Sequence, residues 1–212
     1  MYGLLCRNGF KGMVLFFCVP WVLLGCGDFD ADGADKSGSL FNIDQIDPTY
    51  FDDFTDQVDV IQVNCAAPGE DPDWEPYSDH FADVTLSNRP LNNSTVQTAS
   101  RIRLESYQVW YTPLTQGSPA LDSFLVDTVG DGYTIEPCIP GSDCQGETVS
   151  QIEFVPVRLK DVLREYIEAT GIFQLEYIIH YRFFGVNDYG YPVSAESSTN
   201  FYAANYDNCG GG

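Results

Sequence analysis

Basic side chains are scarce in this sequence. The 212 residues include 10 Lys and Arg against 31 Asp and Glu, and two of the basic residues lie in the first 25 positions. A chain cut before Cys26 would keep all the acids and carry a net charge of about −23. Phosphate groups are bound by clustered Lys and Arg, so this imbalance argues against nucleic acid or anionic lipid headgroups as the main partner.

Long hydrophobic runs are also lacking. The apolar segment Met13–Leu24 has 12 residues, a helix of about 18 Å, whereas the hydrocarbon core of a bilayer is about 30 Å thick. The segment follows two basic residues and ends just before Cys26, so residues 1–25 are expected to be a cleaved signal peptide. Its last residues, Leu23-Leu24-Gly25-Cys26, resemble the lipobox of bacterial lipoproteins, which implies that Cys26 is diacylated. The alternative is an ordinary secretory signal that ends in Gly-Cys by chance.

The segment after the predicted lipidation site is dominated by aspartate. Residues 26–56 are expected to form a lipidated acidic tether, because like charges repel one another and keep the chain extended. Within this segment, Asp28, Asp30 and Asp32 have the spacing of the first ligands of a calcium loop. The twelfth position of such a loop should be Glu but is Ser39. We therefore assign these acids no metal and treat them as weak candidates only.

Four cysteines remain after those of the signal peptide and the predicted lipid anchor. An even number in an oxidising compartment favours disulfides, and four cysteines allow three pairings. We favour Cys138–Cys144, which lie on either side of a Pro-Gly turn, and Cys65–Cys209, which would tie the first strand of the domain to its last. The alternative is a four-cysteine zinc site, but the sequence lacks the C-x-x-C spacing of such sites.

The rest of the chain has the pattern of an all-β protein. Aromatic residues make up 14% of the sequence, which excludes a disordered acidic polymer, and residues 57–212 are expected to form one domain. Short runs of alternating polarity, separated by Gly- and Pro-marked turns, predict a single antiparallel β-sandwich. The expected strands are Val58–Asn64, Phe81–Leu86, Arg101–Tyr111, Ser123–Val129, Tyr133–Glu136, Thr148–Val157, Phe173–Phe183 and Val193–Ala203.

Two segments are predicted in more detail. One helix is expected near 158–170, as a crossover between the sheets, with Gly171 as its C-cap. Its apolar face would consist of Leu159, Val162, Leu163, Tyr166 and Ile167. In the strand Arg101–Tyr111, simple alternation predicts two faces. One face would hold Ile102, Leu104 and Trp110, and the other Arg103, Glu105, Tyr107, Val109 and Tyr111.

Side chains suited to catalysis are few. There is no Gly-x-Ser-x-Gly motif, and His80 and His180 are the only histidines that could act as a base near neutral pH. His180 falls on the more polar face of its strand, where a solvated position explains it. The acids Asp127, Asp131 and Glu136 surround a Gly-Asp-Gly sequence that a hairpin turn already explains. The protein is therefore expected not to be an enzyme and to carry no cofactor.

Aromatic residues in loops are the best candidates for a binding surface. Trp74 and Tyr77 lie in a proline-rich loop, and Tyr189 and Tyr191 flank Gly190 in an expected hairpin turn. Rings at such positions supply a large contact area at low entropic cost. We expect Tyr189 and Tyr191 to form a partly exposed patch with Trp74 or Tyr77. The alternative is that these rings fold back and cap the ends of the sandwich.

Four strand segments, together with the lipobox, carry a resemblance to known proteins. The segments are Asp79-His80-Phe81-Ala82-Asp83-Val84, Ser106-Tyr107-Gln108-Val109-Trp110-Tyr111, Tyr181-Arg182-Phe183-Phe184-Gly185 and Ser197-Ser198-Thr199-Asn200-Phe201. They resemble a group of uncharacterised bacterial envelope lipoproteins with an immunoglobulin-like β-sandwich domain. The resemblance covers nearly the whole mature chain and implies that fold, without the antibody-type Cys–Trp–Cys arrangement. Gly27, in the position after the lipidated cysteine, implies a lipid anchor in the outer membrane, facing the periplasm or the cell surface.

These features predict a membrane-anchored cell-envelope lipoprotein that acts as a non-catalytic structural or protein-interaction module. Its expected partners are the membrane, through the lipid, and an envelope or extracellular protein. The alternative function is carbohydrate binding at the surface through the loop aromatics, with or without calcium. A hydrolase is a third and weaker hypothesis, because no nucleophile is evident.

Overall fold

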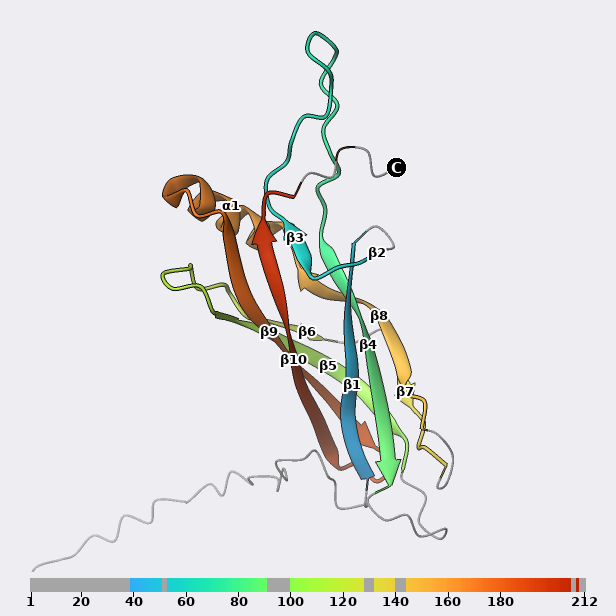
Figure 1. Ribbon diagram of the computed structural model, residues 1–212. Coiled ribbons are helices and arrows are strands. Elements are labelled where there is room, and N and C mark those ends of the chain that lie inside the picture. The colour runs from blue at the N-terminus through green and yellow to red at the C-terminus, as the bar shows by residue number, and fades with distance from the viewer. Residues whose placement is uncertain are drawn as a thin grey trace, which may run out of the picture.

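The computed structural model describes residues 39–50, 53–90, 100–127, 132–139, 144–206 and Cys209. Within them, alternating apolar residues build two sheets that pack face to face as a sandwich (Figure 1). The first sheet has the strand order β2 (Asp53–Phe54), β1 (Ser39–Tyr50), β4 (His80–Pro90) and β8 (Glu147–Val155). The second has the order β3 (Gln57–Asp59), β10 (Pro192–Ala204), β9 (Gln174–Asn187), β5 (Ile102–Pro113) and β6 (Phe124–Asp127), and β7 (Thr134–Ile135) pairs with β5.

The predicted crossover helix is confirmed. Helix α1 (Val157–Thr170) connects β8 of the first sheet to β9 of the second. It begins after Pro156 and ends at Gly171, whose φ of 70° suits glycine and whose N–H donates to the carbonyl of Ile167. Val162, predicted to be on the apolar face, is exposed. Among the described residues, no helix is both long and apolar enough to span a membrane.

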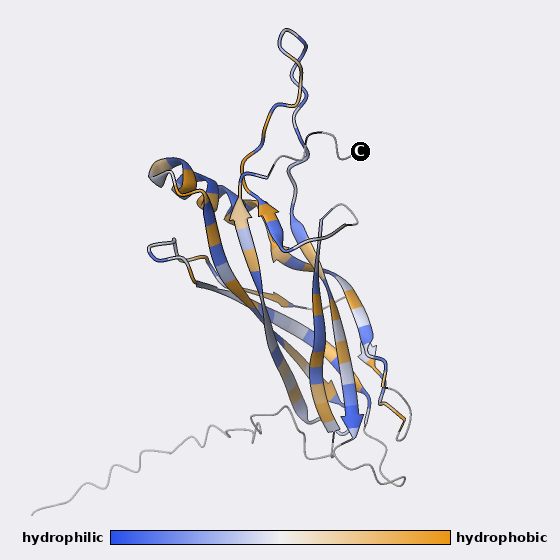
Figure 2. Ribbon diagram, viewed as in Figure 1, coloured by the Kyte–Doolittle hydropathy of each residue, from blue (hydrophilic) through white to orange (hydrophobic). Residues whose placement is uncertain are grey.

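The core lies between the two sheets, as the alternating hydropathy along the strands indicates (Figure 2). In the strand predicted at Phe173–Phe183, alternate residues are apolar, and on β9 (Gln174–Asn187) these residues are buried, namely Leu175, Tyr177, Ile179, Tyr181 and Phe183. Phe173 precedes β9 and is 80% exposed. The hydroxyl groups of Tyr111 and Tyr181 donate to backbone carbonyls of β8, at Phe154 and Glu153 respectively. These hydrogen bonds satisfy two buried phenols and join the sheets across the core.

Strand β5 differs from simple alternation. A β-bulge between Leu104 and Ser106 shifts its register against β9, so one residue is inserted and the parity of the faces changes. Ile102 and Leu104 therefore point into the same core as Tyr107, Val109 and Tyr111, although the sequence pattern placed them on opposite faces. Close packing accompanies the bulge: a Cβ on Gly185 would lie 2.7 Å from the carbonyl oxygen of Arg103.

The predicted tether extends too far into the domain. Residues 26–56 were expected to be tether, but β1 begins at Ser39 and pairs along its length with β4. A register shift between Ile43 and Gln45 interrupts the alternation of β1, and its acids resemble those of the segment before it. Because of these aspartates, the sequence pattern did not reveal strand β1. The predicted lipidation site Cys26 lies outside the described residues.

Strand β3 is also an exception to the expected antiparallel sandwich. It is parallel to β10, whereas every other pair of strands among the described residues is antiparallel. After β2, a link of two residues, Thr55 and Asp56, leads to β3, which pairs with the free edge of β10. Both strands run in the same direction, so the segments that follow them emerge at the same end of the sandwich (Figure 1).

The two ends of the sandwich carry different elements. Ser39 pairs with Pro90, the last residue of β4, at the end where β9 turns into β10; we call this the hairpin end. The other end holds α1, the first residue of β4, His80, and the last residues of β10; we call this the helix end (Figure 1).

Candidate functional site

A projecting loop is the most distinctive surface feature of the molecule. Residues 61–79, which we call the arm, link β3 to β4 and extend beyond the helix end (Figure 1). At its tip, Pro68 and Gly69 form a turn closed by a 3.0 Å hydrogen bond from the N–H of Glu70 to the carbonyl of Ala67. Gly69 has a φ of 94°, and a Pro-Gly pair is the sequence that such a turn requires.

The two sides of the arm pair with each other like a short hairpin. Asn64 and Trp74 form an antiparallel bridge, and the N–H of Cys65 donates to the carbonyl of Asp73 at 2.6 Å. The side-chain oxygen of Asn64 also accepts the N–H of Asp73, at 2.9 Å. These bonds determine the backbone of the arm on both sides of Trp74.

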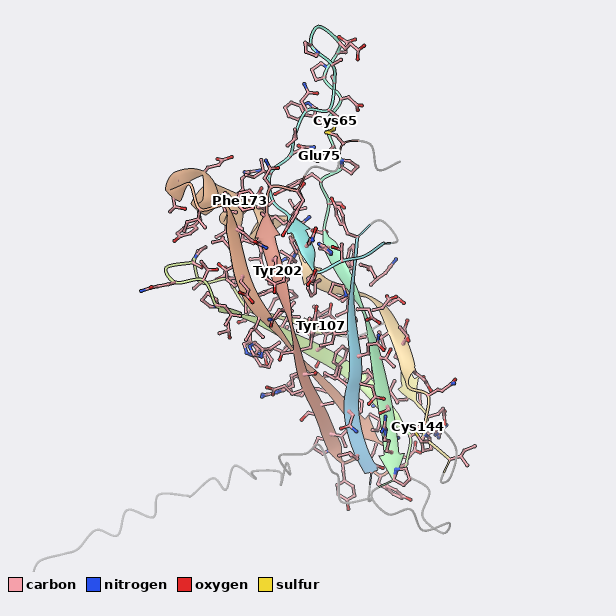
Figure 3. All side chains as sticks on the ribbon, viewed as in Figure 1. Cys65, Glu75, Tyr107, Cys144, Phe173 and Tyr202 are labelled. Carbon is pink, nitrogen blue, oxygen red and sulfur yellow. A yellow bond between two sulfur atoms is a disulfide. The ribbon has the colours of Figure 1, made fainter. Side chains whose placement is uncertain are left out.

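Glu75 fastens the arm from inside. Its carboxylate is buried and accepts the N–H of Val63 at 2.6 Å, while its own N–H donates to the carbonyl of Val63 at 3.0 Å. The amide of Gln62 donates to the Glu75 carbonyl at 2.9 Å. One side chain therefore joins the two sides of the arm just below Trp74, at the position labelled in Figure 3.

A disulfide attaches the arm to the segment after β10. Cys65 and Cys209 are bonded across 144 positions of sequence, and Cys138 is bonded to Cys144, so the favoured pairing is confirmed. Cys65 lies on the arm rather than in a first strand, whereas Cys144 lies near the opposite end of the sandwich (Figure 3). The zinc alternative is wrong for these cysteines, because their sulfurs are paired with each other.

Asp59 holds the base of the arm. Its carboxylate is buried and one oxygen accepts the N–H of Ile61 at 3.3 Å and the N–H of Tyr206 at 3.2 Å. The same side chain thus binds the chain leaving β3 and the chain leaving β10. Burial raises the pKa of Asp59 to about 6, although both backbone donors favour the ionised form.

Lys160 lies beneath the arm with its side chain fully buried. The Nζ atom of Lys160, on helix α1, lies 4.6 Å from the ring centroid of Tyr50 and 5.3 Å from that of Tyr77. Among the described residues, Nζ has no hydrogen-bond partner, and its charge lies against the faces of these two aromatic rings. Burial lowers the pKa of Lys160 to about 8, and the charges of Asp59 and Asp79 oppose that shift.

His80 completes the buried cluster. Its ring centroid is 5.0 Å from that of Tyr50, and its Nε2 donates to the carbonyl of Thr55 at 3.2 Å. Burial, reinforced by the charge of Lys160, lowers the pKa of His80 to about 3. The imidazole is therefore neutral near pH 7, and this histidine packs the junction between β1, β4 and β8, where its ring contacts Tyr50 and Phe154.

The end of the arm is fixed as firmly as its beginning. The hydroxyl of Tyr50 donates to the carbonyl of Pro76 at 2.9 Å. Asp79, the last arm residue, accepts the N–H of Val157 at 2.7 Å and so caps the first turn of α1. No side chain of the helix supplies this cap, because its N-cap residue is Pro156. The arm and the helix therefore support each other.

The four aromatic candidates do not lie together. Trp74 is on the arm and 56% exposed, and Tyr77 is half-buried at its base. Tyr189 and Tyr191 are 70% and 47% exposed in the turn between β9 and β10, where Asn187 accepts both of their N–H groups. That turn is at the hairpin end, one length of β9 or about 45 Å from the helix end. The expected common patch is therefore not formed.

The other candidates have structural explanations or lie outside the described residues. His180 stacks on Trp110 at 5.0 Å and forms a 3.0 Å hydrogen bond with Thr112 on the outer face of the second sheet. Asp127 ends β6 and Glu136 follows β7, and the described residues contain no group of three metal-type side chains. The remaining acids of the weak metal candidates lie outside the described residues, namely Asp28, Asp30, Asp32 and Asp131.

Sequence reasoning missed the residues that anchor the arm, namely Asp59, Glu75 and Lys160. For Lys160 a signal existed: it precedes Leu163 by three positions and Ile167 by seven, so it lies on the buried face of the helix. The two acids gave no such signal in a chain with 31 of them. No family model, curated protein or solved structure matches the chain.

Proposed function

We propose that this protein is a lipid-anchored, non-catalytic module of the cell envelope that binds another protein through the arm. The observation that best supports this proposal is the exposed indole of Trp74, which lies in a loop whose two sides are hydrogen-bonded to each other. Tryptophan is enriched among the residues that contribute most to protein interfaces. A loop that is ordered before binding loses less entropy when the complex forms. The hydrogen bonds of Glu75, the cap at Asp79 and the disulfide at Cys65 provide that order.

The position of the arm relative to the chain entry supports the same function. The chain enters the sandwich at Ser39, at the hairpin end, while the arm leads into the other end of β4. An 11-residue strand separates the two points by about 35 Å. A lipid on Cys26, 13 positions before Ser39, would hold the hairpin end toward the membrane. The arm would then be presented away from it, where a partner can reach Trp74.

We also propose that the sandwich is immunoglobulin-like. The strand order β1-β4-β8 in one sheet matches the A-B-E arrangement, and β10-β9-β5-β6 matches G-F-C with a following C′ strand. In this assignment the arm belongs to the A–B connection and α1 to the E–F connection. Both lie at the helix end, so the binding surface is separate from the loops that antibody variable domains use.

Two experiments test the proposal. Cys26→Ser should release the protein from the membrane fraction, whereas extraction of the wild type should require detergent. Wild-type protein found in the soluble fraction would reject the proposed lipid anchor. For the binding function, a photo-crosslinking residue is placed at Ala67, which is exposed on the arm, and, as a matched control, at Tyr189 in the hairpin turn. We expect a discrete adduct in intact cells from the Ala67 position only, lost when Trp74→Ala is added.

The absence of an adduct from the arm, or the same adducts from both positions, would reject the arm as the binding surface. The carbohydrate hypothesis makes a different prediction for the same variants. It requires purified protein to bind defined glycans on an array, with binding lost in Trp74→Ala or in Tyr189→Ala.

A further inference from the structure

We infer that the partner presents a cationic surface whose Lys or Arg side chains pack against the Trp74 indole. This inference rests on the proposed function and specifies the chemistry of its partner. Charge on the arm is the first argument. Its 19 residues include five acids and no Lys or Arg. Glu75 points inward and Asp79 caps α1, so the remaining three face solvent around Trp74, namely Glu70, Asp71 and Asp73.

The rest of the described surface does not offset this charge. Each arginine of the described residues lies within 4 Å of an acid, in pairs such as Arg158–Glu153 and Arg164–Asp161 beside the helix end. Lys160 is buried. An anionic partner would therefore approach the helix end against net repulsion, whereas a cationic one would be steered toward it.

The indole of Trp74 is open to a cation from outside. Four aromatic rings of the described residues hold a cation of this chain over their faces, namely Phe124, Tyr50, Tyr77 and Trp110. Trp74 is not among them, and it is 56% exposed. A guanidinium or ammonium over an indole is the strongest pairing of this kind, and neighbouring carboxylates strengthen it. A cationic side chain can therefore interact with the Trp74 indole and with the neighbouring carboxylates at the same time.

The test uses purified protein and two synthetic peptides of equal length. One alternates Arg and Lys with Ser, and the other has Glu at each Arg and Lys position. Fluorescence anisotropy of the labelled peptides measures Kd at several salt concentrations. We expect binding of the cationic peptide only, weakened about tenfold by Trp74→Ala. Asp71→Asn with Asp73→Asn should also weaken binding and reduce its dependence on salt. Tyr189→Ala, an exposed aromatic at the other end, should leave Kd unchanged.

Several outcomes would overturn the inference. They are equal binding of the two peptides, no binding of the cationic peptide, or equal losses from Trp74→Ala and Tyr189→Ala. Thermal melts of each variant confirm that it is folded. The crosslinking experiment separates this failure from failure of the proposed function. A Trp74-dependent adduct whose contacted peptide is acidic or neutral would leave the arm as a protein-binding site and reject the cationic partner. An adduct with a glycan would reject both.

Discussion

Replacing Lys160 with Met should remove a specific pH dependence of stability. The Lys160 ammonium has no hydrogen-bond partner among the described residues, and burial lowers its pKa to about 8. In the unfolded chain the amine keeps its proton up to its ordinary pKa of about 10.4. Between these values the unfolded state binds more protons than the folded state. The contribution of Lys160 to the free energy of unfolding therefore rises with pH in this window.

The size of the effect follows from the two pKa values. Their separation corresponds to about 3 kcal/mol, of which about 2.5 kcal/mol is gained between pH 7 and pH 10. Lys160→Met keeps a long side chain between the rings of Tyr50 and Tyr77 but removes the amine. We expect the variant to be at least as stable as the wild type at pH 7. Relative to the variant, the free energy of unfolding of the wild type should then increase by about 2.5 kcal/mol between pH 7 and pH 10.

Urea unfolding of both proteins at pH 7, 8, 9 and 10 measures this difference. Buried tyrosines have raised pKa values in the folded state, to about 12 for Tyr177, whereas in the unfolded chain they lose their protons near pH 10. Both proteins carry the same tyrosines, so this contribution cancels in the difference between them. Arg158→Met, on the same helix but exposed, is the control and should change the stability by the same amount at each pH. Parallel curves for the wild type and Lys160→Met would refute the claim that burial controls this amine.

Three further outcomes test the support of the arm and the hairpin turn. Replacing Cys65 and Cys209 with Ser should lower the free energy of unfolding by up to about 5 kcal/mol, because the loop they close is long; a larger loss from removing the short-loop disulfide would contradict this reasoning. Asp79→Ala should cost about 1 kcal/mol by uncapping α1, and an unchanged melting temperature would show that water replaces the cap. The double variant Tyr189→Ala, Tyr191→Ala should cost about 1 kcal/mol or less, since both rings are exposed; calorimetry showing a loss of 3 kcal/mol or more would mean that they pack as core caps.

Regular periodicity was predictable. The odd-numbered stripe from Leu175 to Phe183 alternates without interruption, and it is buried as its pattern required. The helix near 158–170 was predictable for a similar reason, because apolar residues at helical spacing end at a glycine that adopts a positive φ. The disulfide pairing was favoured among three because one pair closes a short turn. In each case neighbours in sequence carry the information.

Irregular features were not predictable in the same way. The bulge after Leu104 inserts one residue and exchanges the faces of β5, which alternation cannot detect. Strand β1 carries acids and its own register shift, so in the sequence it resembled the predicted tether before it. The prediction that Trp74 and Tyr189 share one patch was wrong, because both residues lie in loops. Loop composition does not specify at which end of a sandwich a loop will lie.

The sequence by itself determined the strand-rich architecture, the crossover helix and the acidity of the surface. These properties follow from the local spacing of apolar residues and from the composition of the chain. Apolar residues at regular spacing are buried together, and charged residues stay at the surface. Only the tertiary structure decided that Asp59, Glu75 and Lys160 meet at the base of the arm. The parallel pairing of β3 with β10 brings the arm beside the end of the chain, and α1 places a lysine beneath it. Contacts between segments so distant in sequence depend on how the sheets pack, because burial and hydrogen bonding select partners in space rather than along the chain.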